Sequence, residues 1–138
     1  MFDNLTEFNG NASATNESVL RFEESIGSKM PEDYLAFLKR FNGGEGYIGD
    51  DAYVILWSTD EIICFNREYE VSENCPELLL IGSNGAGEAY AFDRRSKPWH
   101  VVQVPFVGME SSLCDDMGRT FSEFIERLAR KDSDGWAV

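Results

Sequence analysis

The stretch LLLIGSNGAGEAYAFD, residues 78–93, decides the fold class, because two strand patterns flank a single turn. Leu78 to Gly82 is a short apolar run of the kind found in buried strands. Ser83 to Gly87 contains the residues that turns require, and Glu88 to Asp93 has the composition of a return strand. The stretch therefore predicts an antiparallel hairpin whose glycine-rich loop is longer than two residues.

Toward the C-terminus, Trp99 to Val104 predicts a third strand, which ends at Pro105. No helix-length segment separates it from the hairpin, so these strands are expected to be antiparallel. A last helix is predicted from Thr120, because Thr120 and Glu123 have the spacing of a capping box. Four apolar residues at helical spacing give this helix a buried stripe: Phe121, Phe124, Ile125 and Leu128.

Toward the N-terminus, Pro31 to Phe41 predicts a helix with acidic residues in its first turn and basic residues in its last. An earlier helix is expected over residues 16–26 and a short one over residues 60–66. The apolar run Ala52 to Trp57 predicts a strand covered on both faces, with a short strand at Tyr47 and Ile48 before it.

This order of elements predicts one α+β domain, with helices packed on a mostly antiparallel sheet. A length of 138 residues is that of a single domain. We expect a loosely ordered arm over residues 1–15, the domain over residues 16–131 and a tail over residues 132–138. Five glycines are expected to serve backbone geometry rather than a ligand: Gly43, Gly44, Gly82, Gly85 and Gly87.

The formal charge of −13 disfavours binding to nucleic acid or to an anionic membrane. It favours a basic partner, or serves only to keep the protein soluble. No run of apolar residues is long enough to span a bilayer, and the N-terminus lacks the pattern of a signal peptide. Three cysteines without a CxxC pair are typical of free thiols in a reducing cytoplasm, where we expect the protein to act.

No motif in the sequence predicts catalysis. The loop from Gly82 to Gly87 leads into a strand rather than a helix, and Glu88 would repel a phosphate. His100 is the single histidine, and no nucleophile elbow accompanies it. It is expected to be hydrogen-bonded on a sheet surface. We therefore expect no enzyme, no cofactor and no metal, with a small enzyme kept as the least favoured alternative.

Two glycine-containing segments are similar to signatures of a known family. Residues 31–38, PEDYLAFL, with residues 41–46, FNGGEG, resemble the N-terminal signature of the SMI/KNR-type family within the SUKH superfamily. Residues 80–93 resemble the second signature, and VQVPF at residues 102–106 also fits. The resemblance extends from about residue 16 to residue 130 and implies one α+β domain with N-terminal helices on a central sheet.

The resemblance also implies a function. Bacterial members are regarded as immunity proteins that bind and neutralise polymorphic toxins, whereas fungal members are larger regulators of cell-wall assembly and signalling. The size of this chain resembles the bacterial type, so we expect an immunity protein that occludes a toxin domain. The alternative is a non-catalytic interaction module or scaffold that regulates a cellular partner. A toxin gene beside this one would distinguish the two, and the oligomeric state stays open.

Acidic residues concentrate between Glu45 and Glu77, where nine of them accompany a single base, Arg67. This segment carries a net charge of −8. We expect its centre to meet a basic toxin surface, such as the phosphate-binding site of a nuclease. The alternative is an acidic face that contacts only solvent. The five residues expected at the centre are Glu45, Asp50, Asp51, Asp60 and Glu61.

Overall fold

The computed structural model describes residue 5, residues 7–49 and residues 51–135, with side chains through residue 130. The elements follow the chain as β1 (Phe8–Gly10), α1 (Asn16–Ile26), α2 (Glu32–Arg40), β2 (Gly44–Ile48), β3 (Ala52–Leu56), α3 (Thr59–Glu68), α4 (Val71–Asn74), β4 (Leu78–Ser83), β5 (Glu88–Asp93), β6 (His100–Pro105), the 3-10 turn η1 (Ser111–Leu113), β7 (Asp115–Gly118) and α5 (Phe121–Gly135).

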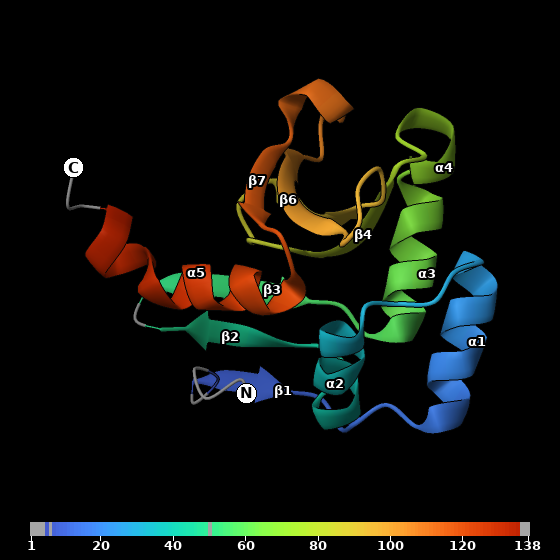
Figure 1. Cartoon of the computed structure of the whole chain (residues 1–138), viewed down its shortest axis with the longest axis horizontal. Coiled ribbons are helices and arrows are strands. Elements are labelled where there is room, and N and C mark those ends of the chain that lie inside the picture. Colours follow the sequence, from blue (N-terminus) through green and yellow to red (C-terminus); the bar gives the residue numbers. More distant parts are fainter. Residues whose placement is uncertain (1–4, 6, 50, 136–138) are drawn as a thin grey trace.

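In the described residues, the seven strands form a single antiparallel sheet in which spatial order follows sequence order. The predicted α+β class is confirmed, as is the hairpin of β4 and β5. The sheet has one weak seam, because β3 pairs with β4 only through Ile55 with Ser83 and Leu56 with Gly82. Helices α3 and α4 are inserted in the chain at this seam (Figure 1).

Both predicted chain ends need correction. The expected loose arm is wrong for Phe8–Gly10, which pairs with β2 in the register Phe8 to Gly46, while Phe8 itself is buried. The expected tail is wrong over residues 132–135, because α5 continues to Gly135. Residues 136–138 lie outside the described residues. Strand β7 was also not predicted, since its sequence DDMG shows no strand pattern.

The main core lies between the sheet and the pair α2 and α5. Three rings meet there: Tyr34 of α2 lies 5.1 Å from Phe92 of β5 and 5.0 Å from Phe121 of α5, centroid to centroid. In Figure 1, α5 extends along β2 and β3, so the buried side of that hairpin faces α5. Among the described residues, none of the helices has the length and apolar composition needed to cross a bilayer.

Candidate functional site

The hairpin of β2 and β3 buries one side and opens the other. Gly46 and Ile48 of β2 are buried, as are Ala52, Val54 and Leu56 of β3. The intervening side chains are exposed or half-buried because alternate residues of a strand point to opposite sides. The expectation that this strand is covered on both faces is therefore wrong. We call the open side the hairpin face; it consists of Glu45, Tyr47, Tyr53 and Ile55.

Two tyrosines form the centre of the hairpin face. Tyr47 and Tyr53 are direct cross-strand partners, and their rings meet edge to face with centroids 5.2 Å apart. The Tyr53 hydroxyl donates a hydrogen bond to Oε2 of Glu45. This hydrogen bond is the main reason that the pKa of Tyr53 is raised above its usual value of 10.0. Sequence reasoning missed both tyrosines; alternation across the hairpin is the signal that could have found them.

The structure divides the acidic residues expected at the binding centre. The amide of Thr59 donates to Oδ1 of Asn42 at 2.9 Å, which holds the start of α3 beside the start of β2. Glu45 therefore lies at the same end of the hairpin as Asp60 and Glu61. Exposed Asp51 follows the opposite end of β2, separated from α3 by the length of β3, roughly 13 Å. Asp50 lies outside the described residues.

Glu61 also has a local structural role. Its carboxylate accepts a hydrogen bond from the Ser58 amide at 2.9 Å, and its own amide donates to the Ser58 hydroxyl at 3.2 Å. This reciprocal capping box begins α3. Asp60 takes no part in it and is exposed in the same first turn. Of the two carboxylates, Asp60 is thus the one whose replacement leaves the cap intact.

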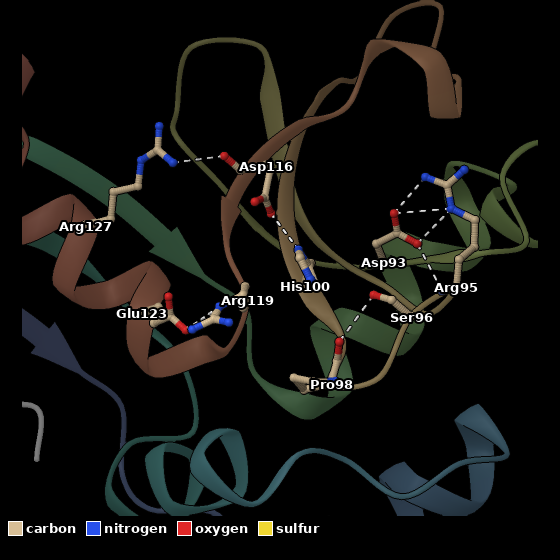
Figure 2. A network of polar contacts seen from close by, with 9 residues as sticks. All are labelled: Asp93, Arg95, Ser96, Pro98, His100, Asp116, Arg119, Glu123 and Arg127. Carbon is tan, nitrogen blue, oxygen red and sulfur yellow. Dashed lines mark hydrogen bonds and ion pairs between the residues drawn. The ribbon is translucent and has the colours of Figure 1, made fainter.

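Basic side chains that follow β5 and β7, and one on α5, are held by local contacts (Figure 2). Arg95 forms an ion pair with Asp93 at 2.7 Å, and its hydrogen bonds lower the pKa of the Asp93 carboxyl. Arg127 donates to the main-chain oxygen of Asp116 at 3.1 Å. The partners of these cations are Asp93 and Asp116 rather than the carboxylate of the hairpin face.

The contacts and burial of His100 and of three tryptophan and tyrosine residues show how the fold places them. Nδ1 of His100 lies 3.0 Å from Oδ1 of Asp116 on the neighbouring strand, which confirms a hydrogen-bonded histidine on the sheet. Trp57 and Tyr90 are buried, whereas Trp99 is half-buried and lines a surface cavity of about 840 Å³. Within the described part of the chain, no three His, Cys, Asp or Glu side chains gather to form a metal site.

The glycines of the predicted turns occupy positions where a side chain is costly. Gly43 has φ +79°, and a Cβ built on it would lie 2.6 Å from the main chain of Leu56 and Trp57. Gly82 has no left-handed conformation, but its Cβ would lie 2.3 Å from the Ile55 oxygen. Gly44, Gly85 and Gly87 all have positive φ values. Gly43, Gly44 and Gly82 thus lie where main-chain segments around the hairpin and the seam approach one another closely.

The comparisons with known proteins agree with the resemblance seen in the sequence. A family model described as the SMI1 / KNR4 family (SUKH-1) matches residues 13–127. This range includes every described element from α1 to β7 and the first half of α5. No curated protein matches the chain.

Proposed function

We propose that this chain, which belongs to the SMI1/KNR4 (SUKH-1) family, is an immunity protein that binds and neutralises a toxin domain. The observation that carries the proposal is the family match over residues 13–127. Bacterial members of this family are regarded as immunity proteins, which supports the same role here. Neutralisation by occlusion requires an accessible surface and no chemistry of the inhibitor's own. The exposed side of the β2–β3 hairpin and the start of α3 supply such a surface.

The charge of this surface supports a basic partner. Exposed carboxylates at Glu45, Asp51 and Asp60 lie on the segment that carries most of the negative charge of the chain. Toxins that cleave nucleic acid need an electropositive site for phosphates, and an acidic inhibitor complements such a site. Opposite fields also accelerate encounter, which benefits an inhibitor that must capture its toxin before damage occurs.

The experiment uses the toxin domain whose gene adjoins that of this chain. Cells that express the toxin domain should die alone and survive when the chain is co-expressed, and the purified proteins should form a complex. Death in spite of co-expression, together with the absence of a complex, would contradict toxin neutralisation. An isolated gene with no toxin neighbour would favour the alternative, a scaffold that regulates a cellular partner.

A pair of charge-reversal variants tests the acidic surface. The double variant Asp51→Lys, Asp60→Lys should associate with the toxin at least about tenfold more slowly at low salt. The control, Glu24→Lys with Glu73→Lys, makes the same change in net charge at exposed residues of α1 and α4. The control should slow association less, and high salt should reduce the difference. If the two double variants slow association equally, the net charge of the chain and not this surface causes the effect.

A further inference from the structure

The hairpin face leaves aromatic surface open on the second and third strands of the sheet. Tyr47 is 48% exposed although Tyr53 of β3 lies on one side of it and the backbone of Glu7, just before β1, on the other. Among the described elements, α5 is the helix that packs on this hairpin, and it covers the opposite side. Large aromatic side chains in such positions are enriched where proteins bind one another, because they bury much area at little entropic cost.

The chain segment that carries the two tyrosines supplies acidic side chains and no basic ones. The sequence contains no Lys or Arg between Arg40 and Arg67, a segment that includes the whole hairpin. Glu45 contributes a carboxylate on the hairpin face. Exposed Glu7, which directly precedes β1, lies beside Tyr47, because its main-chain oxygen accepts a hydrogen bond from the Tyr47 amide. The Glu45 carboxylate can accept further hydrogen bonds besides that from Tyr53.

This combination has a definite chemical preference. The face of an aromatic ring attracts a cation, and a carboxylate beside the ring adds an ion pair. A guanidinium group suits the combination better than an ammonium group, because its planar shape stacks on a ring while its N–H groups donate to a carboxylate. We propose that the hairpin face is the docking site for an arginine side chain on the basic surface of the partner protein. This proposal rests on the proposed function and names the anchor of that contact.

A second copy of this chain is a poorer occupant of the hairpin face. Two copies that met through this side would bring Glu45 of one toward Glu45 of the other. Each copy would also carry its formal charge of −13 to the contact. Like charges in an interface are destabilising, whereas a basic partner gains from the same field.

The first test uses a small probe and does not need the toxin. N-acetyl-arginine amide is titrated into the full chain, and the ring resonances of Tyr47 and Tyr53 are followed by NMR. The expected result is a progressive shift of both ring resonances that N-acetyl-citrulline amide, the neutral counterpart, does not cause. Glu45→Gln should reduce the arginine shifts. Equal shifts with both probes, or none with either, would overturn the arginine site.

The second test uses the toxin domain from the adjoining gene. Tyr47→Ala should weaken binding by about 30-fold or more, the loss typical of an anchor residue. Tyr69→Ala is the matched control, because Tyr69 is 43% exposed but lies after α3, stacked on Phe106. The control should bind within a few-fold of the unmodified chain. If the folded Tyr47→Ala variant binds the toxin domain as tightly as the unmodified chain, the inference is overturned and the proposed function is left intact.

Failure of the proposed function has a different signature. If the unmodified chain does not bind the toxin at all, the immunity role is wrong and the probe titration alone decides the arginine site. Sedimentation of the unmodified chain tests whether a second copy of the chain occupies the hairpin face instead. A monomer supports a foreign partner, whereas a dimer that Tyr47→Ala dissociates would overturn the proposal in favour of a second copy.

Discussion

The side-chain amide of Asn66 in α3 makes two hydrogen bonds with the main chain of Leu80 in β4. Its Nδ2 donates to the Leu80 oxygen at 2.8 Å, and its Oδ1 accepts from the Leu80 amide at 3.0 Å. β3 pairs with β4 only at Ser83 and Gly82, so Asn66 satisfies the groups that a longer β3 would have bonded. One side chain thus fastens α3 to the seam of the sheet.

Replacing Asn66 with Ala should destabilise the fold by about 2–3 kcal/mol, because it leaves the main-chain groups of Leu80 without these partners. Urea unfolding of the variant and the wild type measures the difference. Asn74→Ala is the control, since Asn74 is exposed and makes one hydrogen bond, to the Glu70 oxygen at 3.2 Å. A variant at Asn66 that is as stable as the control would contradict this role.

Gly43→Ala should destabilise the fold more than Gly87→Ala. Both glycines have positive φ, so each variant incurs a backbone cost of about 1–2 kcal/mol. Only at Gly43 would the new Cβ also press on main-chain atoms, of Leu56 and Trp57, whereas nothing lies within 4 Å at Gly87. Thermal unfolding of the two variants checks the order, and equal melting temperatures would show that the turn at Gly43 can relax.

Asp93→Asn should make stability less dependent on pH in acid. Hydrogen bonds from Arg95 lower the pKa of Asp93 below its usual 3.8, so the charged form is favoured in the folded state. The contribution is fully present above the unfolded pKa of about 3.8 and is lost as pH falls through the lower folded value. Half-exposed Arg95 limits it to about 1 kcal/mol. Urea unfolding should therefore show that wild type is more stable than the variant at pH 7 and that this difference disappears below pH 4. A difference that stays the same at both pH values would contradict the prediction.

Glu45→Gln should lower the pKa of Tyr53. The hydrogen bond from the Tyr53 hydroxyl to Glu45 favours the protonated phenol, and the negative charge of Glu45 acts in the same direction. Absorbance titration above pH 9 follows tyrosinate formation, and subtraction of each protein's Tyr53→Phe counterpart isolates this residue. An unchanged Tyr53 titration in Glu45→Gln would mean that the two side chains do not pair in solution.

Local sequence signals predicted α1, α2, α3, α5 and the β4–β5 hairpin, because caps, turn residues and apolar periodicity act over a few residues. The short helix α4 was not predicted. Thr15 caps α1, and the Thr120 hydroxyl accepts from the Glu123 amide at the start of α5. Strands β1 and β7 could not be predicted in this way. They are short and polar, and pairing with a distant strand stabilises them, as between Phe8 and Gly46.

The acidic composition of the candidate site could be predicted from the sequence, but the spatial arrangement of its residues could not. The acidity of residues 45–77 is visible in the sequence, and Ser58 with Glu61 is a recognisable start of a helix. An apolar run such as AYVIL does not reveal whether its Tyr53 side will be covered, because a helix from elsewhere in the chain decides that. The separation of Asp51 from α3 likewise follows from the extension of β3.

The most direct test of the proposed immunity function measures whether the chain inhibits the activity of its toxin. The activity of the toxin domain from the adjoining gene is assayed on that toxin's own substrate while the purified chain is titrated in. Occlusion by an immunity protein predicts that activity falls in proportion to added chain and reaches background near equimolar amounts. Full toxin activity in the presence of a large excess of folded chain would contradict it.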